Sequence, residues 1–486
     1  MEEKMVGIKS WGTYLPNYKL PREKIGDAWD FPKIPGTKSV ANYDEDSITM
    51  AVEAGLECLK GIDLDSIDGL FFASTTAPYA EKLNASFLTT VLDLNEDILT
   101  NDFMGTTRAS TTALRVAYDT IKAGNAKNIL ITTADKRNPV PVSMYEYGMG
   151  DAAAALLVSE DDTLASIEGY HSINKNTVGP YRRAKDEYVR TFEIKVETKL
   201  NYTGTMVEAL KGVMEKFELG PKDIKRASYY APDPRYHGWV SKKIGFSRRA
   251  TMDTLWMNLG NVGTPLPFII FATTLEKTRD GHNLLLGGYG DGADAFYLIG
   301  KDAAREMKNE RRSVKKSIRK MEKMNNYNNY LKNRYLVKGE KPLKRKASPV
   351  QIWREADRLH RLYGVKCKEC GQIQYPNWRA CFTCGAKDNF ERYKLPRHGT
   401  VFTFTLDHLQ GAEYFETPVP RVVIELPEGG RILLNMTDCN PYELEIGDEV
   451  EFVFRKSHEG GDLEQHQNMI GYYYKCRKRV SSGSED

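Results

Sequence analysis

Four cysteines place the strongest constraint on what this chain can fold into. Cys367 and Cys370 form one C-x-x-C pair, Cys381 and Cys384 form a second, and a glycine follows each pair. Four thiolates at this spacing suit a tetrahedral Zn²⁺ ion, and glycine suits a tight turn that aims two sulfur atoms at one ion. Two disulfide bonds or four unrelated thiols are the alternatives. Because four protein ligands leave no open position on zinc, the pattern predicts a structural metal site in a small module.

The length and composition are typical of a globular protein with several domains. The 486 residues suffice for about two to four domains, and 41% of them are hydrophobic. No apolar run approaches the ~20 residues that cross a bilayer, and the charged N-terminus lacks an apolar signal core. The chain has seven cysteines, and the three outside the metal pattern do not suggest a disulfide framework. We therefore expect a cytoplasmic protein.

A basic segment stands out against a small net charge. The net charge of +3 makes no case for nucleic-acid binding by the whole chain, yet residues 301–346 are dense in lysine and arginine. We interpret this segment as a solvated helix or linker, and the alternative is a docking surface for a polyanion such as the phosphates of a nucleotide-like cofactor. Nucleic-acid binding would also use Phe402, Phe404, Tyr414 and Phe415 for stacking, although these aromatics serve equally well in a barrel core.

Residues 1 to about 300 alternate strand-like and helix-like segments. Apolar runs predict buried strands at 6–8, 69–74, 128–133, 152–158, 226–230 and 283–286. Small and apolar residues with helical spacing predict a helix from Ala109 to Ile121, and Gly124 is a plausible C-cap. This alternation predicts an α/β architecture with buried sheets.

The C-terminal part predicts a different architecture. A helix is expected from Pro349 to Tyr363, with Ser348 as its N-cap. After the cysteines, alternating segments predict strands at 399–406, 420–426, 432–436 and 449–455, the last of the series. Short strands separated by turns indicate a small closed β-barrel of the OB type. We expect the polar tail from Ser481 to be disordered.

Several motifs resemble those of a known family. They are V-G-I-K-S-W-G-T-Y-L-P-N-Y-K-L near the N-terminus, P-Y-R-R at 180–183, K-K-I-G-F at 242–246, G-N-V-G-T-P at 260–265 and G-G-Y-G-D-G-A-D at 287–294. Over roughly residues 5–300 the chain resembles archaeal-type hydroxymethylglutaryl-CoA synthases of the thiolase superfamily. From about Ser348 it resembles the zinc-ribbon and OB-fold domain that accompanies thiolases and these synthases.

The resemblance implies a thiolase-like αβαβα fold of two similar halves, dimerisation, and Claisen-type chemistry on CoA thioesters. It also implies a thiolase as a partner, since the accompanying domain bridges synthase and thiolase in that family. The expected domains are a thiolase-like N-terminal half at 1–165, a C-terminal half at 166–300, a basic linker at 301–347, a helix and zinc ribbon at 348–395, an OB-fold barrel at 396–480 and a tail at 481–486.

The catalytic groups of the family are changed at most positions in this chain. The cysteine nucleophile falls on Thr107, the histidine on Tyr230 and the glutamate near Thr75, whereas the asparagine is kept as Asn261, together with a glycine-rich loop around Gly290. A threonine hydroxyl is far less acidic than a thiol and needs an adjacent base. A tyrosine with a pKa near ~10 is a poor base. We therefore expect no acyl-enzyme on Thr107.

The residues that replace the family's groups still suit a non-covalent site. Backbone N–H groups at the helix start and near Gly290 would hold a thioester or enolate oxygen, Asn261 would donate a hydrogen bond, and Tyr230 would supply a phenolic proton. The structural alternatives are that Thr107 caps the helix, Tyr230 fills the space of an imidazole and Asn261 supports loop backbone. We interpret His237, near Tyr230 in sequence, as a surface or satisfied histidine.

The candidate CoA contacts are basic residues within the family motifs: Arg182, Arg183, Lys242 and Lys243. Solvated surface residues are the alternative. Three functions stay open: a subunit that makes or breaks a C–C bond in an acyl-CoA, acting with a thiolase; a catalytically silent scaffold of a thiolase complex; and a nucleic-acid-binding zinc-ribbon and OB-fold protein, which would leave the α/β part without a role. We favour the enzyme because Asn261, the glycine loop and the basic pairs are kept.

Overall fold

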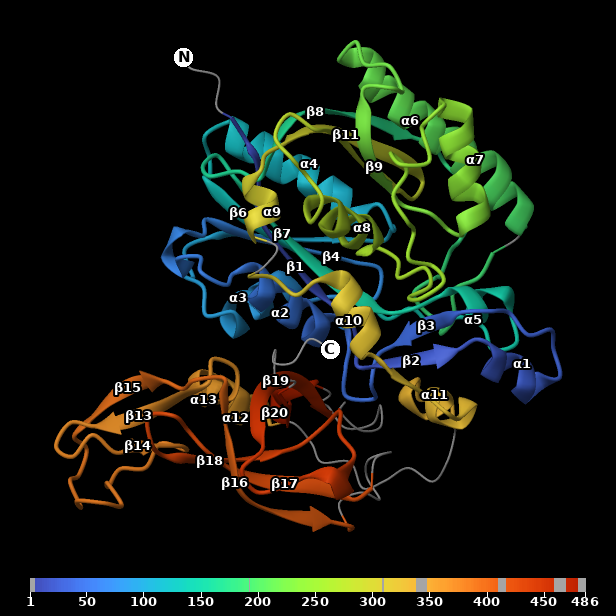
Figure 1. Cartoon of the computed structure of the whole chain (residues 1–486). Helices are drawn as coiled ribbons and strands as arrows, with labels where there is room; N and C mark the ends of the chain where they lie inside the picture. The colour runs from blue at the N-terminus through green and yellow to red at the C-terminus, as the bar shows by residue number, and fades with distance from the viewer. Residues whose placement is uncertain are drawn as a thin grey trace. The chain divides into compact units, whose positions relative to one another are not determined.

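The computed structural model describes residues 5–191, 193–307, 310–337, 348–409, 417–458 and 469–479. The chain divides into two compact units, shown in Figure 1. Unit one comprises Met1–Ala41 and Asp46–Arg334, and unit two comprises Asn42–Glu45 and Tyr335–Asp486. Within the described ranges, no helix is long and apolar enough to cross a membrane.

A nine-stranded sheet with the order β5-β4-β6-β7-β1-β8-β11-β10-β9 forms the centre of unit one. Its strands are β1 (Gly7–Tyr14), β4 (Gly69–Ser74), β5 (Leu99–Met104), β6 (Asn128–Asp135), β7 (Ala152–Ser159), β8 (Ala165–Asn174), β9 (Ile224–Tyr229), β10 (Asn283–Tyr289) and β11 (Gly292–Gly300). A short antiparallel pairing of β1 with β8 joins two wings of the sheet. All the strands that the sequence predicts here are confirmed, whereas β5, β8 and β11 are additional.

Helices lie between the two wings and outside them. They are α2 (Ser47–Cys58), α3 (Asn84–Val91), α4 (Ala109–Lys122), α6 (Thr203–Lys216), α7 (Pro234–Ile244) and α8 (Leu266–Leu275). Helices α4 and α8 contact strands of both wings, whereas α2 and α3 cover the first wing and α6 covers the second (Figure 1). Every residue of α8 is buried, as expected for a helix that is apolar all round. This is the αβαβα layering that the resemblance implies.

The smaller elements of unit one include part of the basic segment. They are β2 (Tyr18–Pro21), β3 (Thr37–Val40), β12 (Glu322–Lys323), α1 (Glu23–Trp29), α5 (Met144–Gly148), a π-helical turn η2 (Val196–Tyr202), α9 (Ala303–Met307), α10 (Val314–Lys320) and α11 (Tyr327–Asn333). Arg311 donates to Ser10 Oγ at 2.9 Å, and buried Arg334 pairs with Asp151 at 2.6 Å. These two arginines are therefore buried in unit one, unlike the residues of a solvated linker, and polar groups of the fold accept hydrogen bonds from their guanidinium groups.

A five-stranded sheet with the order β18-β17-β16-β19-β20 forms the barrel of unit two. Its strands are β16 (His398–Asp407), β17 (Val419–Glu425), β18 (Arg431–Asn435), β19 (Glu449–His458) and β20 (Gly471–Lys478). A bridge between Met436 and Cys476 brings the two sheet edges together, so the barrel is nearly closed. The four predicted strands are confirmed, but the expectation that 449–455 is the last strand is wrong. Strand β20 was missed because its buried residues do not alternate.

The zinc-ribbon region precedes the barrel in sequence. Ser348 caps α12 (Pro349–Arg354) by accepting from the Gln351 N–H at 3.3 Å, as expected. A second short helix, α13 (Ala356–Leu359), follows, and the prediction that the helix reaches Tyr363 is wrong. Leu362 has a left-handed φ of 56°, which ends helical backbone before Tyr363. The strands here are β13 (Tyr363–Cys367), β14 (Ile373–Gln374) and β15 (Phe390–Lys394).

Some expectations have no structural outcome. Tyr414, Phe415 and the tail from Ser481 lie outside the described residues. Phe402 lies on β16 with the Arg431 guanidinium 3.3 Å from its ring centroid. The six domain boundaries stay predictions.

Candidate active site

A cavity of about 230 Å³ in unit one brings several of the predicted site residues together. Its lining residues are Thr75, Gly105, Thr106, Thr107, Arg137, Gly179, Pro180, Tyr181, Arg182, Val189, Tyr289, Gly290 and Asp291. Thr75, Gly105 and Gly290 directly follow β4, β5 and β10, so the cavity opens at the carboxyl ends of these strands. This is where α/β sheets generally bind ligands.

Thr107 lies at the cavity wall just before α4. Its Oγ1 donates to the Tyr289 carbonyl at 2.7 Å, and the N-cap position of α4 is Arg108, which makes no side-chain cap. Thr107 is therefore not the helix cap. The backbone N–H groups of Thr106 and Thr107 donate to no acceptor in the described part of the chain. They precede a 14-residue helix, whose N-terminal dipole favours negative charge.

Gly290 allows the turn between β10 and β11 to approach the start of α4. A Cβ atom at this position would lie 2.3 Å from Thr106 Oγ1 and 2.8 Å from Thr107 Oγ1, so a larger residue would not fit. The Gly290 N–H already donates to the Gly292 carbonyl at 3.0 Å. This N–H is therefore not free for a substrate oxygen. The role of Gly290 is to let the β10–β11 turn lie against Thr106 and Thr107.

Tyr230 and Asn261 form a buried hydrogen-bonded pair. Asn261 Nδ2 donates to Tyr230 Oη at 2.8 Å, while Asn261 Oδ1 accepts from Arg137 Nη2 and from the Gly263 N–H, both at 3.0 Å. Burial raises the pKa of Tyr230, against the opposing effects of Arg137, Asn261 and Thr107. Tyr230 thus holds its proton near neutrality and suits the role of a donor better than that of a base.

The four basic candidates are separated by the structure. Arg182 lines the cavity and donates to the Thr75 carbonyl at 3.1 Å. Arg183 is exposed and pairs with Asp186 at 2.8 Å. Lys242 and Lys243 are exposed in the last turn of α7 and do not line the cavity. Only Arg182 of this group is brought to the site.

His237 is neither a surface histidine nor a satisfied one. It lies on α7 with 5% of its surface exposed, and its ring stacks on Tyr229 with 4.2 Å between centroids. Its Nε2 has no hydrogen-bond partner among the described residues. Burial lowers the pKa of His237 to about 3, so it is neutral at physiological pH.

Two charged residues that the sequence analysis missed lie at or beside the cavity. Arg137 lines it with only 3% of its surface exposed, and Glu197 is 5% exposed. Glu197 Oε2 accepts from Tyr145 Oη at 2.5 Å and from Thr191 Oγ1 at 2.7 Å. The position of Arg137, two residues after the end of β6, was a usable signal, whereas no local pattern marks Glu197.

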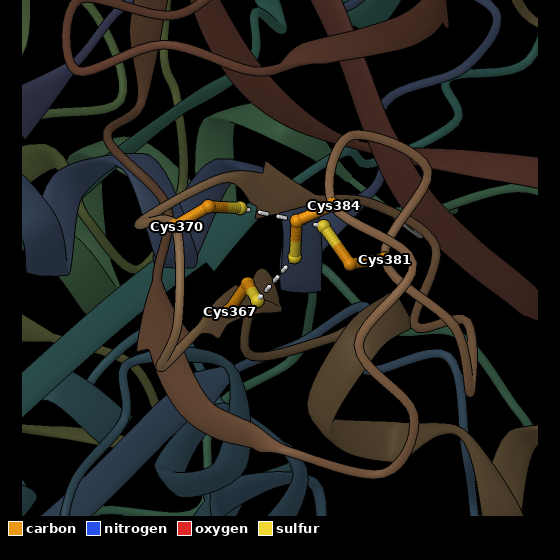
Figure 2. A group of neighbouring side chains, drawn as sticks. All are labelled: Cys367, Cys370, Cys381 and Cys384. Atoms are coloured by element: carbon orange, nitrogen blue, oxygen red, sulfur yellow. Dashed lines mark hydrogen bonds between the residues drawn. The ribbon is translucent and has the colours of Figure 1, made fainter.

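The four cysteines of unit two converge, as Figure 2 shows, and their sulfur atoms all lie within 4.8 Å of one another. A Zn–S bond of ~2.3 Å places sulfur atoms ~3.8 Å apart in a tetrahedron. Cys367 and Cys384 sulfur atoms are 3.7 Å apart, and those of Cys370 and Cys381 are 3.5 Å apart. The donor set therefore fits a structural zinc ion.

The glycines that follow the cysteine pairs form the expected turns. Gly371 and Gly385 have φ angles of 75° and 76°, which favour glycine. Their N–H groups donate back to the carbonyls of Cys367 and Cys381, both at 2.9 Å. Each turn therefore fixes one end of the sulfur cluster through backbone hydrogen bonds.

Three family models match parts of the chain. The model described as 3-oxoacyl-[acyl-carrier-protein] synthase III matches residues 102–175. The ChsH2 rubredoxin-like zinc ribbon domain matches residues 354–391, and the ChsH2 C-terminal OB-fold domain matches residues 393–455. The zinc-ribbon and OB assignments made from the sequence are therefore confirmed.

The hydroxymethylglutaryl-CoA synthase of Thermococcus sibiricus is 30% identical over 311 residues, which cover 62% of this chain and 89% of that protein. The chain belongs to the hydroxymethylglutaryl-CoA synthase family. The synthase of Pyrococcus horikoshii is 28% identical over 339 residues, covering 68% of this chain and 96% of the relative.

Solved structures show the same fold. MvaS in complex with 3-hydroxy-3-methylglutaryl coenzyme A superposes with a TM-score of 0.61 at 19% identity, covering 71% of this chain and 95% of that one. FabH from Pseudomonas aeruginosa gives a TM-score of 0.55 at 16% identity, covering 61% and 98%. The thiolase-like α/β fold is therefore confirmed, and the chain is condensing-enzyme-like.

Proposed function

We propose that this protein makes or breaks a carbon–carbon bond in an acyl-CoA thioester, by Claisen or retro-Claisen chemistry, without an acyl-enzyme. Family membership supports the substrate class. The cavity supports the reaction type, because free N–H groups and a buried guanidinium surround a space that none of the described cysteines or histidines lines.

The charge that develops on a thioester oxygen needs preorganised donors. The N–H groups of Thr106 and Thr107 and the guanidinium of Arg137 suit that role at the wall of the cavity. Tyr230 is not itself a lining residue, but its ring lies 6.1 Å from that of Tyr289, which is. Tyr230 retains its proton, and because its oxygen accepts from Asn261, we propose that the phenolic hydrogen is donated toward the cavity.

Thr107 is poorly arranged to act as a nucleophile. Its hydroxyl donates to the Tyr289 carbonyl, which cannot serve as a base for that proton. In our proposal the Thr107 side chain therefore fixes the wall of the cavity, and its N–H group is the functional part of the residue.

Arg182 is our proposed contact for CoA phosphate, because it lies at the cavity and guanidinium groups bind phosphates well. Arg183, Lys242 and Lys243 stay predictions as further phosphate contacts. The four cysteines would hold a structural zinc ion, which stabilises the fold of its module and leaves no position for substrate.

We propose a homodimer and a thiolase partner as the assembly. Strand β5 is an edge of the large sheet, and Leu99 and Met104 expose 44% and 43% of their surfaces there. A partly exposed edge strand offers its unpaired backbone groups to a second copy. The thiolase partner rests on the resemblance of the C-terminal part.

Turnover of a panel of acyl-CoA thioesters, with and without a co-purified partner, tests the proposed function. We expect Tyr230→Phe and Asn261→Ala each to lower turnover by ~10²–10³, the usual effect of losing one such donor. Tyr170→Phe is the matched control, because its hydroxyl bonds Asp119 at an exposed position away from the cavity. Unchanged turnover in both site variants would exclude this site.

A catalytically silent scaffold is the second candidate, and the missing cysteine and histidine at the described cavity wall favour it. A scaffold would form a complex with its partner and alter the partner's kinetics. This chain alone would show no turnover, and Tyr230→Phe would not change the turnover of the complex.

A further inference from the structure

The buried carboxyl group of Glu197 has no part in the chemistry proposed so far. Glu197 lies on η2, and both of its hydrogen bonds end on Oε2, from Tyr145 Oη and Thr191 Oγ1. Oε1 accepts no hydrogen bond from any residue that the structure describes. Oε1 is not one of the fully enclosed side-chain oxygens among the described residues, so it is open to a hydrogen bond or a proton from a ligand.

The carboxyl lies directly behind the cavity wall. A Cβ atom on Gly179, which lines the cavity, would lie only 3.6 Å from Glu197 Oε2 and 3.1 Å from Thr191 Oγ1. Because residue 179 is glycine, no side chain occupies the space between the carboxyl and the cavity.

Titratable groups from several elements face Glu197. They are Tyr145 on α5, Arg137 after β6, Tyr230 after β9 and Tyr289 at the end of β10. Burial raises the pKa of Glu197 above its usual value, while hydrogen bonds from Tyr145 and Thr191 and the charge of Arg137 act in the opposite direction. A carboxyl group whose pKa is raised in this way suits proton transfer.

We propose that Glu197 is the acid–base residue of the cavity and exchanges a proton with the acyl group through Oε1. This assignment rests on the proposed function. The position of the family's glutamate falls near Thr75 in this chain, and Glu197 would supply the carboxyl group that is missing there.

The proton balance is simple in the condensing direction. Glu197 Oε1 takes a proton from the α-carbon of the thioester, so that a C–H bond breaks and an O–H bond forms. The electron pair moves onto the thioester oxygen, which faces the N–H groups of Thr106 and Thr107. The enolate carbon then attacks the carbonyl carbon of a second acyl thioester and forms the C–C bond. The C–S bond of the resulting tetrahedral intermediate breaks, and the thiolate that leaves takes the proton from Glu197. Cleavage follows the same steps in reverse, with no oxidant or reductant.

Exchange of α-protons for solvent deuterium isolates this step. Acetyl-CoA and propionyl-CoA are incubated with the full chain in deuterium oxide, and their mass is followed with time. We expect exchange by the wild type and a loss of ~10²–10⁴ in rate for Glu197→Gln, the range for removal of a general acid–base group. Glu193→Gln, an exposed carboxyl on the same segment, is the control that keeps the wild-type rate.

A second variant separates proton transfer from a structural role. Tyr145→Phe removes a hydrogen bond that lowers the pKa of Glu197, so that pKa rises. Since the carboxylate is the active form for α-proton removal, the acidic limb of the pH–rate profile moves to higher pH. If Glu197 only stabilises the fold, the acidic limb of the pH–rate profile stays in place in Tyr145→Phe. That result would overturn the assignment, and it can be obtained even if Glu197→Gln does not fold.

The outcomes distinguish this inference from the proposed function. Exchange in the wild type that persists in Glu197→Gln overturns the role of Glu197 and leaves the proposed function standing. No exchange in the wild type with any thioester, alone or with its partner, overturns both.

Discussion

Replacing Arg455 tests whether the buried charges of unit two stabilise its fold. The Arg455 guanidinium contacts Asp44, Glu45 and Asp438, with a 2.5 Å distance to Asp438 Oδ2 and 3.8 Å to Asp44 Oδ1, and all four side chains are at most 1% exposed. Methionine approximates the length of arginine without its charge. After Arg455→Met, Lys475 would still pair with Asp44 at 2.7 Å and Arg477 with Asp438 at 3.7 Å, while the guanidinium that contacts all three carboxylates would be gone.

The expected cost follows from the burial. Removing one partner of a buried ion pair costs about 3–5 kcal/mol, because the remaining charges are left uncompensated. For a domain of roughly 150 residues, each kcal/mol lowers the Tm by ~2–4 °C, so Arg455→Met is expected to lower the Tm of unit two by ~6–20 °C. Hydrogen–deuterium exchange of peptides from β19 and β20, measured at increasing temperature, follows the unfolding of this unit separately from that of unit one.

Arg379→Met is the matched control. Arg379 pairs with Asp388 at 2.7 Å, but the two side chains are 89% and 55% exposed. Exposed pairs contribute about 0–1 kcal/mol. If Arg455→Met destabilises unit two no more than Arg379→Met does, then buried charge pairing does not hold this barrel together, and our reasoning is refuted.

Four further outcomes are expected. Cys381→Ser should lose the single zinc ion per chain that mass spectrometry should find in the wild type; full retention would contradict the tetrahedral site. Iodoacetamide should not inactivate turnover through the cavity, because Thr107 cannot be alkylated as a thiol can, and a modified cysteine at the cavity would show that the family alignment is wrong. Although burial alone would raise it, Lys475 and Arg455 hold the pKa of Asp44 below its usual value. The unfolded carboxyl therefore takes up its proton first, and unit two should lose stability as the pH falls below about 4; urea titrations with the same midpoint at pH 3 and pH 6 would argue against this. Arg182→Ala should raise the KM for acyl-CoA with little change in kcat if it binds phosphate, and an unchanged KM would remove it from the site.

Local patterns in the sequence were enough for much of the fold. The spacing of Cys367, Cys370, Cys381 and Cys384 is set by the geometry of a single ion, so it can be read without knowing the rest of the chain. Strands buried on both faces, such as β4 and β6, appear as short apolar runs. Strand β20 could not be predicted because polar residues such as Lys475 are buried on it, so the sequence shows no alternation of apolar and polar residues.

The candidate site was only partly predictable, because it is built from segments far apart in sequence. Thr107 and Gly290 could be found from family motifs, and the structure places both at one cavity. Arg137 and Glu197 belong to no motif, and they matter only because the fold buries them beside that cavity. The prediction for His237 was wrong for a similar reason, because nothing in its local sequence reveals that its ring is buried and stacked on Tyr229.

The assignment of Asn42–Glu45 to unit two has a consequence for dividing the protein. A fragment that starts at Tyr335 would carry Arg455 and Lys475 but lack Asp44 and Glu45, two of the acids that neutralise them. The C-terminal region matches separate family models, but some of the acids that pair with its buried cations come from near the N-terminus. A chimera that exchanges this region must also graft the four-residue segment Asn42–Glu45, or else supply new counter-charges for Lys475 and for Arg455, which would keep Asp438 but lose Asp44 and Glu45.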